Sequence, residues 1–464
     1  MTRAPFRYYD RRGPDLAGQR VGLSELLGLL SHALDMTEGQ PPGHCLRVCW
    51  IGTRIGQVLG MDGPALSDLY FTLLLKDLGC SSNAARICAL YLTDDIDFKK
   101  DFKTIDSSLS AALRFVFAKT GPDAGLAERV RSIVNILKNG GKISRDLIET
   151  RCQRGAEIAS KMRFSPAVQA GILSLDEHWD GSGKPAGLVG HAIPRAANIA
   201  LLAQVADVFL NASDPAAAQR EVESRANQWF DPALVAAFQT VAADPAFWQT
   251  LASPDLETQV FALPPGATAA PVDDDWLDDI AAAFADVVDA KSPFTADHSR
   301  RVTLYTDMIA EQMQLAPDHR RWLRRAALLH DLGKLSVSNT ILDKPAKLDP
   351  DEWTKVRAHS WHSERILERI AVFRDIAPIA GAHHERLDGK GYPYGLTAGD
   401  IGLEVRILSV ADVFDALSAE RPYRGALPIA RVFEIMTADI GTALDGDCVA
   451  ALQSALARLQ AQAA

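Results

Sequence analysis

The sequence predicts an all-α protein that contains two related helical domains. Apolar positions follow His298 in steps of four, three and four residues as far as Ile309, which is the spacing of one face of a helix. The same steps run from His44 to Ile55. Alternation with a period of two, which marks half-buried strands, is scarce. Glycine-rich segments such as residues 388–393 are predicted to form loops.

A segment with the composition of a linker divides the chain. Residues 263–275 are rich in proline, glycine and alanine, and they end in three aspartates. Such a composition is typical of exposed connections between domains. We therefore expect a first domain over residues 20–262 and a second domain over residues 276–464.

The two halves repeat the same landmarks in the same order. A histidine and an aspartate lie 33 residues apart in both halves, as His44 and Asp77 and as His298 and Asp331. An Asp-Gly-x-Gly-x-Pro segment and then a Val-Ala-Asp-Val-Phe segment follow in each half. Ordered matches of this kind indicate an internal duplication.

The composition excludes some classes of function. The net charge of −10 disfavours a nucleic-acid polymer as the main partner, because an acidic surface repels phosphate backbones. No apolar run approaches the ~18 residues of a membrane span, and the N-terminus lacks the apolar run of a signal peptide. The six cysteines form no CxxC pair. We expect a cytoplasmic protein with reduced thiols and no membrane partner.

Histidine and carboxylate residues gather in the second half. His298 alone would be an ordinary core histidine on an apolar helix face. His330 and Asp331 change this interpretation, because neighbours on a helix point about 100° apart and suit two adjacent metals better than one. Further nitrogen and oxygen ligands come from His359, His383, His384 and Asp412. A ligand set without thiolate fits iron or manganese, and zinc less well.

Residues 275 to about 425 resemble an HD-GYP domain, the cyclic di-GMP phosphodiesterase branch of the HD superfamily. Two intact motifs carry the resemblance, HDLGK at 330–334 and HHERLDGKGYP at 383–393. It implies two divalent metal ions with Asp331 as the bridging ligand. The implied ligands are His298, His330, Asp331, His359, His383, His384 and Asp412. Some members use a glutamate for a third metal, but Phe294 stands at that position, which favours two.

Two further residues have predicted roles next to the metals. Lys334 follows His330 by one helical turn, and its charge could neutralise an oxygen of the phosphodiester. Asp415 could orient a ligand histidine from outside the ligand set. Together with Asp331, these residues make up the predicted catalytic group.

The predicted substrate contacts lie in two loops. Arg421 and Arg424 flank a rigid proline and could hold phosphates, a use that the family resemblance also implies. Gly389 and Tyr392 would shape the second motif's loop and line the substrate pocket.

We expect the second domain to hydrolyse cyclic di-GMP to pGpG or GMP, through a hydroxide that bridges two metals and attacks phosphorus in line. The motifs recognise metal and phosphate but not base edges, so another cyclic dinucleotide such as cyclic GMP-AMP is an alternative substrate. A non-catalytic adaptor that binds a cyclic dinucleotide is a second alternative, which the intact ligand set disfavours. A mononucleotide phosphohydrolase is a third, which the GYP loop and the two arginines disfavour.

The first half keeps the landmarks but has lost most of the ligands. Lys76 stands in the place of His330, where a cation opposes metal binding. The places of His359, His383 and His384 are taken by Arg151, Leu175 and Asp176. We interpret the first domain as a degenerate HD-like domain that supports regulation or dimerisation, with a homodimer or a protein signalling partner as the expected assembly.

Overall fold

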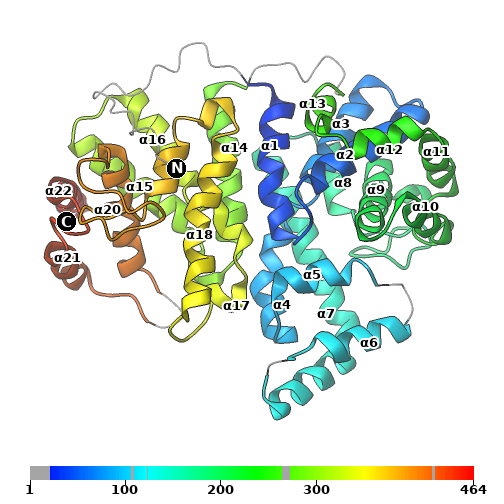
Figure 1. Cartoon of the computed structure of the whole chain (residues 1–464), viewed down its shortest axis with the longest axis horizontal. Helices are drawn as coiled ribbons and strands as arrows, with labels where there is room; N and C mark the ends of the chain where they lie inside the picture. Colours follow the sequence, from blue (N-terminus) through cyan, green and yellow to red (C-terminus); the bar gives the residue numbers. More distant parts are fainter. Residues whose placement is uncertain (1–20, 106–108, 123, 264–271, 421–423, 464) are drawn as a thin grey trace. The chain divides into compact units, whose positions relative to one another are not determined.

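The computed structural model describes residues 21–105, 109–122, 124–263, 272–420 and 424–463, and most of these residues are helical (Figure 1). No β-strand occurs among them, and extended pairing is limited to isolated bridges. The predicted all-α class is confirmed. The chain divides into two compact units, one containing Val21–Trp276 and Ser338–Thr340, and the other containing Leu277–Val337 and Ile341–Ala464. Most of the predicted linker lies outside the described residues.

The first unit consists of helices of very different length. Its helices are α1 (Leu23–Thr37), α2 (His44–Val58), α3 (Gly63–Leu75), η1 (Cys80–Asn83), α4 (Ala84–Tyr91), α5 (Asp95–Phe102), α6 (Leu109–Lys119), α7 (Leu126–Lys161), α8 (Pro166–Leu173), η2 (Gly190–Ala192), α9 (Arg195–Ala212), α10 (Pro215–Ser224), α11 (Pro232–Ala242), α12 (Pro245–Leu251) and α13 (Leu256–Phe261).

The second unit follows the same order in a shorter form. Its helices are α14 (Asp274–Asp289), η4 (Pro293–Thr295), α15 (His298–Gln312), α16 (Pro317–Leu329), η5 (Leu332–Ser336), α17 (Asn339–Leu342), α18 (Pro350–Leu367), η6 (Ala371–Phe373), α19 (Ala377–Ala382), α20 (Leu403–Ser418), α21 (Ile429–Ala438) and α22 (Gly446–Ala463). The first residues of α14 and of α17 are grouped with the first unit.

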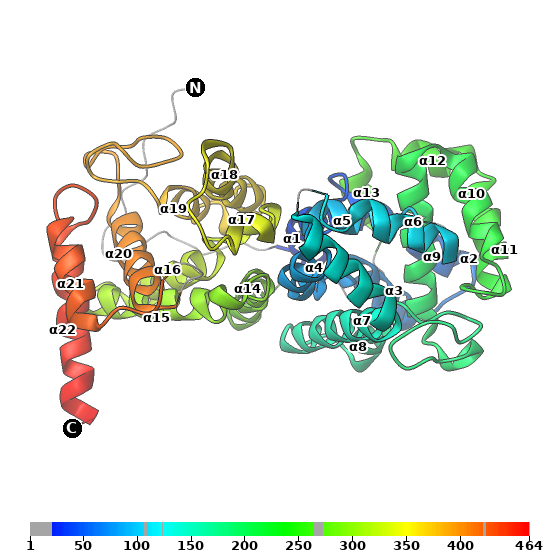
Figure 2. The same cartoon turned by 90° about the horizontal axis from the view of Figure 1, so that it is seen from below.

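Equivalent helices pack in equivalent ways in the two units. In the first unit α2 lies against α3 and α9, and α7 lies against α8. In the second unit α15 lies against α16 and α20, which Figure 2 shows side by side, and α18 lies against α19. This repeated packing agrees with the duplication predicted from the sequence.

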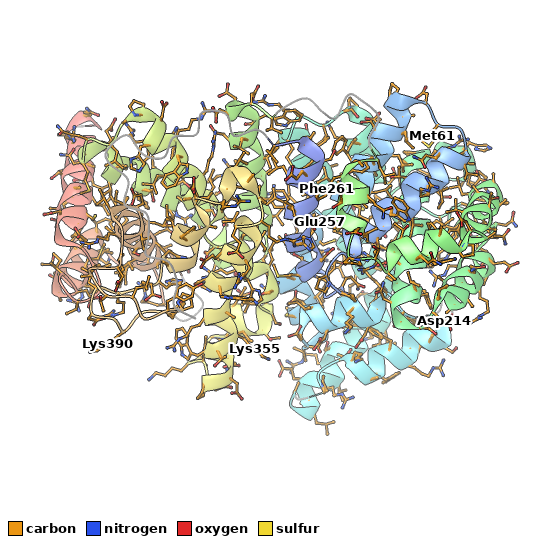
Figure 3. All side chains as sticks on the ribbon, turned by 45° about the horizontal axis from the view of Figure 1, so that its top comes forward. Met61, Asp214, Glu257, Phe261, Lys355 and Lys390 are labelled. Carbon is orange, nitrogen blue, oxygen red and sulfur yellow. The ribbon has the colours of Figure 1, made fainter. Side chains whose placement is uncertain are left out.

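The predicted apolar face of α15 is buried. Val302 and Ile309 are fully buried, whereas Leu304 on the opposite side is 55% exposed. Large side chains fill the space between the helices of each unit (Figure 3), with Trp322 and Phe414 among the buried ones in the second unit. Burying an apolar side chain of this size stabilises the fold by about 1.5–3 kcal/mol, so this face fixes the orientation of α15.

Carboxylates from the preceding helix fix the first turn of α15 and of α2. Asp289 accepts hydrogen bonds from the backbone nitrogen of Ser299 at 3.0 Å and from its hydroxyl at 2.7 Å. Asp35 accepts one from the backbone nitrogen of Cys45 at 2.9 Å. These bonds satisfy donors that the first turn of a helix leaves without partners. They also hold His298 at the first position of α15.

Two glycines allow a close approach that positions the site. A Cβ on Gly333 would lie 2.0 Å from the carbonyl oxygen of His359, and a Cβ on Gly79 would lie 1.9 Å from that of Arg151. Only glycine fits at either position, because any side chain would collide with backbone. The contact brings η5 against α18, and it establishes that Arg151 and His359 occupy equivalent places.

Candidate metal centre

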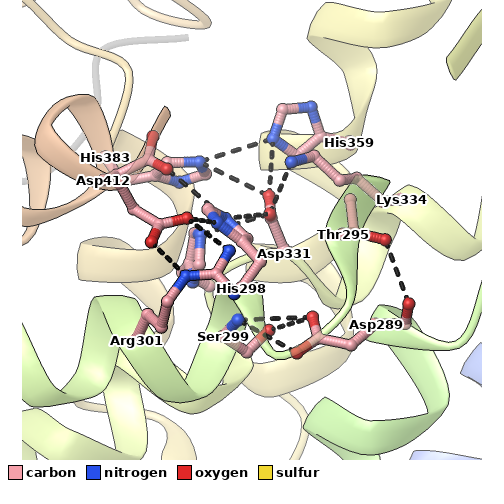
Figure 4. Close-up of polar contacts among 12 residues, drawn as sticks. Asp289, Thr295, His298, Ser299, Arg301, Asp331, Lys334, His359, His383 and Asp412 are labelled. Atoms are coloured by element: carbon pink, nitrogen blue, oxygen red, sulfur yellow. Dashed lines mark hydrogen bonds and ion pairs between the residues drawn. The ribbon is translucent and has the colours of Figure 1, made fainter. Parts of the chain in front are cut away.

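Asp331 lies at the centre of the predicted ligands and presents one oxygen to each of two pairs of histidines. Its Oδ2 atom lies 3.3 Å from Nε2 of His298 and 3.2 Å from Nε2 of His330. Its Oδ1 atom lies 3.2 Å from Nε2 of His359 and 3.7 Å from Nε2 of His383. Figure 4 shows this carboxylate between the imidazoles. A carboxylate with this arrangement can bridge two ions.

Three of the histidines are oriented by backbone carbonyls of their own helices. Nδ1 of His330 bonds to the carbonyl oxygen of Ala327 at 2.7 Å. His359 and His383 make the same bond with the residue three positions earlier, at 2.5 Å and 2.6 Å. A proton held on Nδ1 leaves the lone pair of Nε2 free, which is the form of imidazole that binds a metal.

Asp412 and His384 complete the cluster. Oδ1 of Asp412 lies 3.4 Å from Nε2 of His298, and its Oδ2 lies 3.9 Å from Nδ1 of His384. Side-chain ligand atoms converge in three overlapping groups: His298, His330 and Asp412; His330, Asp331 and His383; and His359, His383 and His384. The structure thus brings all seven predicted metal ligands together.

The protonation states suit metal binding. Burial, together with the nearby His330, lowers the pKa of His383 to about 3. Burial and the nearby His383 likewise lower the pKa of His384. Burial raises the pKa of Asp331, but the charges of His330 and Lys334 outweigh it and hold that pKa well below its usual range. His383 and His384 are therefore neutral imidazoles and Asp331 is an ionised carboxylate, which are the forms of these groups that bind a metal ion.

Orphaned polar atoms also fit a metal. Nε2 of His298, Nε2 of His330 and Oδ1 of Asp331 are buried and lack hydrogen-bond partners. Leaving such atoms unsatisfied costs about 1–3 kcal/mol each, and coordination to an ion would remove that cost. The residues present therefore fit divalent metal ions.

Asp415 acts on the cluster through His298. Its Oδ2 atom lies 2.7 Å from Nδ1 of His298, so it fixes the ring while Nε2 faces Asp331. Arg301 in turn bonds Asp415 through Nε at 2.6 Å. Burial opposes protonation of His298, but the nearby carboxylates of Asp331 and Asp415 outweigh it and raise its pKa to about 9. This contact places Asp415 where it can orient a ligand histidine, as predicted from the sequence.

Lys334 lies at the edge of the cluster. Its ammonium pairs with Oδ2 of Asp331, and its side chain is 18% exposed. The ring of Tyr392 lies 4.7 Å from that of His384, so the second motif's loop also reaches the cluster. Gly389 has φ +76°, a left-handed conformation that favours glycine, which agrees with its predicted role in shaping the loop.

The structure describes one of the two predicted phosphate-binding arginines. Arg421 lies outside the described residues. Arg424 donates from Nη1 to the carbonyl oxygen of Leu417 at 2.9 Å and from Nη2 to that of Ala416 at 2.8 Å. These bonds cap the last turn of α20, and a phosphate would have to displace them. Phosphate binding by Arg424 remains a prediction.

Comparison with known proteins identifies the fold. The protein-family model described as HD domain matches residues 99–234 and 282–448, which lie in both units. The chain belongs to the HD domain family. The resemblance noted in the sequence is thereby confirmed, and so are the two HD-type helical domains.

Relatives of known function cover the chain to different extents. The chain is 52% identical over 434 residues to the 3'3'-cGAMP-specific phosphodiesterase 3 of Vibrio cholerae, and the match covers 94% of each protein. It is 36% identical over 179 residues to the cyclic di-GMP phosphodiesterase response regulator RpfG of Xanthomonas campestris, which covers 38% of this chain and 47% of that protein. A crystal structure of a cyclic GMP-AMP specific phosphodiesterase of V. cholerae matches with a TM-score of 0.65 and 47% identity, over 94% of this chain and 98% of that one.

The first HD unit carries a lysine at the position equivalent to His330. Nζ of Lys76 lies 3.1 Å from Nε2 of His44 and pairs with the carboxylate of Asp77. The ammonium is fully buried, and it satisfies the two groups that correspond to His298 and Asp331. Arg151 and Asp176, which replace His359 and His384, form an ion pair with each other.

Asp207 differs from its sequence counterpart. The Val-Ala-Asp-Val-Phe match aligns it with Asp412, but its contacts are those of Asp415. Oδ2 of Asp207 lies 2.6 Å from Nδ1 of His44, and its Oδ1 lies 2.6 Å from Nε of Arg47. Leu210 occupies the sequence position of Asp415 and cannot make these bonds, so Asp207 makes them instead.

Sequence reasoning did not assign a role to Arg301, Ser299 or Asp289. Arg301 could have been found from the repeat, because Arg47 also lies three residues after the first histidine of its unit. The repeat also marks Asp289, because Asp35 and Asp289 each lie nine residues before the first histidine of their unit.

Proposed function

We propose that this protein is a metal-dependent phosphodiesterase that hydrolyses 3'3'-linked cyclic GMP-AMP in its second HD unit. The observation that carries the proposal is the position of Asp331 between two pairs of histidines, with one carboxylate oxygen beside each pair. The sequence alone placed cyclic di-GMP first and cyclic GMP-AMP second. The relative named for the latter substrate spans 94% of this chain, whereas RpfG spans 38%, and this difference supports the reverse order.

We propose two divalent ions, iron or manganese, as the cofactor. Bound there, they would supply Lewis-acid stabilisation of the phosphoryl oxygens and would activate water. The chain's own residues set the geometry. The three carbonyl-anchored histidines present Nε2, while Asp415 fixes the ring of His298.

Lys334 and Tyr392 act at the edge of the ligand set. The ammonium of Lys334 pairs with Asp331 and is part-exposed, so it can also meet an oxygen of the substrate and offset its developing negative charge. Burial raises the pKa of Tyr392, so its hydroxyl stays neutral and can donate a hydrogen bond to a phosphate oxygen.

The first HD unit has a regulatory or dimerising role in this proposal. Its equivalent of the metal position is filled by Lys76, and its counterparts of His359 and His384 pair with each other. These contacts leave no set of imidazoles like that of the second unit. A protein signalling partner or a second copy of the chain is the expected assembly.

The test is turnover by purified protein loaded anaerobically with Fe(II) or with Mn(II), beside Asp331→Asn. Linear dinucleotide or mononucleotide product should form from cyclic GMP-AMP with kcat/KM at least about tenfold above that for cyclic di-GMP, and the variant should form none. Faster turnover of cyclic di-GMP would return the substrate to the first prediction. Binding of either compound without product in both metals would indicate the adaptor.

A further inference from the structure

A row of aromatic and guanidinium groups runs along one exposed face of α18. Trp353, Arg357, Trp361 and Arg365 follow each other at intervals of four residues, so they lie one above another on the helix. The guanidinium of Arg357 lies 5.5 Å from the ring centre of Trp353, and that of Arg365 lies 5.3 Å from the ring centre of Trp361. The two tryptophans are 44% and 41% exposed.

The first pair of this row reaches the metal centre. The guanidinium of Arg357 also lies 5.4 Å from the ring centre of Tyr392. Tyr392 lies beside His384, which belongs to one of the ligand groups. Figure 3 labels Lys355 on this part of α18 and Lys390 on the loop that carries Tyr392. A ligand imidazole, a phenol, a guanidinium and an indole therefore follow each other outward from the metal centre.

Arg357 has hydrogen-bond donors to spare. Its side chain is exposed, and within the described parts of the chain no carboxylate pairs with it. Two rings within about 6 Å of the guanidinium restrict its position, and they accept none of its N–H groups as conventional hydrogen-bond acceptors would, so these donors remain available to a ligand. Arg365 differs, since its Nη1 bonds Glu368 at 2.5 Å.

We propose that Arg357, held between Trp353 and Tyr392, binds the guanine base of the cyclic dinucleotide. This inference rests on the proposed function. Guanine presents O6 and N7 as adjacent acceptors, which match the two parallel donors of a guanidinium, whereas adenine replaces O6 with an amino donor. The half-exposed ring of Trp353 adds a surface on which a base stacks.

The row belongs to the catalytic copy alone. The contacts of Gly79 and Gly333 show that Arg151 and His359 are equivalent positions in the two copies. Glu149 therefore corresponds to Arg357, and Arg145 corresponds to Trp353. An acidic side chain at the position of Arg357 could not donate to guanine. The arrangement therefore accompanies the intact metal ligands.

The test compares Arg357→Ala, Arg357→Lys and Trp353→Ala with Arg365→Ala, a matched control two helical turns away in a similar pair. Substrates are cyclic di-GMP, cyclic GMP-AMP and cyclic di-AMP. In Arg357→Ala, KM for the two guanine-containing substrates should rise about tenfold or more, while kcat changes less. Arg357→Lys should stay impaired because an ammonium lacks the paired donors, and Arg365→Ala should match the wild type.

The inference is overturned if Arg357→Ala leaves KM unchanged. It is also overturned if KM for cyclic di-AMP rises by the same factor, since Arg357 would then recognise the charge of the phosphates and not the guanine base. Rescue by lysine would have the same meaning. Failure of the proposed function is distinguishable, because wild-type protein would then cleave bis(p-nitrophenyl) phosphate but no cyclic dinucleotide. That result would overturn both.

Discussion

Nζ of Lys76 lies 3.1 Å from Nε2 of His44, the atom that corresponds to the orphaned Nε2 of His298 in the second unit. The first unit thus uses an ammonium where the second presents ligands. A buried carboxylate, Asp77, completes the contact. Because this ammonium offsets the buried negative charge of Asp77, removing it should lower the free energy of unfolding more than removing the part-exposed ammonium of Lys334 in the second unit.

Lys76→Met should destabilise the first unit by about 3 kcal/mol, because it leaves Asp77 buried without its partner. Urea unfolding followed by circular dichroism would measure the loss. Lys334→Met is the matched control, since Lys334 also pairs with an aspartate but is part-exposed. It should cost less stability and should lower turnover. Equal stability losses in the two variants would contradict this account.

Asp331→Asn should abolish metal binding and lower turnover at least about 10³-fold, because one of the two bridging oxygens becomes a neutral amide nitrogen. Metal content of the purified protein, measured by mass spectrometry, checks the first effect. Asp77→Asn makes the same change in the first unit and should leave the metal content unchanged. A fall in metal content with Asp77→Asn would place a metal in the first unit.

Asp415→Asn should weaken metal affinity about 10- to 100-fold, because the ring of His298 loses the carboxylate that orients it. The expected signature is a turnover that recovers with added metal ion. Titration of activity against Mn(II) concentration would show this shift. An unchanged titration curve with a lowered maximum would instead place Asp415 in the chemical step.

Stability should fall in mild acid because of His178. Its ring stacks on that of Trp229 with centres 4.2 Å apart, and burial lowers its pKa from 6.5 to about 4. The folded state therefore favours the neutral ring. This contribution is complete above about pH 6.5 and is lost as pH falls toward 4, with a maximal loss of about 2 kcal/mol after allowance for its partial exposure.

Thermal unfolding midpoints at pH 7 and pH 4.5 would test the role of His178. His178→Phe keeps a ring against Trp229 but cannot take up a proton. Its midpoint should fall less between the two pH values than that of the wild type. The same fall in both proteins would exclude His178 as the source.

The helices of this fold and the residues that gather around Asp331 could be predicted from the sequence, because local patterns mark both. Helical periodicity marks α15. The first motif contains the five residues 330–334, which include Asp331, and the second motif begins with the histidines at 383 and 384. The duplicated landmarks also indicated the two units. Such signals depend on neighbours in the chain and survive without knowledge of packing.

Contacts between distant segments could not be predicted in the same way. The sequence predicted that Asp415 orients a ligand histidine, but it did not specify His298, which lies 117 residues away in the chain. Asp207 shows the same limit, since its sequence match gave its position but not the direction of its carboxylate. Arg357 resembles any charged residue on an exposed helix until the fold brings Tyr392 beside it.

Because of the buried Lys76, the two halves also differ in whether they need ions from solution. Lys76 is supplied by the polypeptide and is present whenever that unit is folded, whereas ions for the second unit must come from solution. Scarcity of metal would therefore act on one half of the protein and spare the other. Under the proposed function, the duplicated chain joins a half that depends on metal from solution to a half whose buried cation belongs to the chain itself.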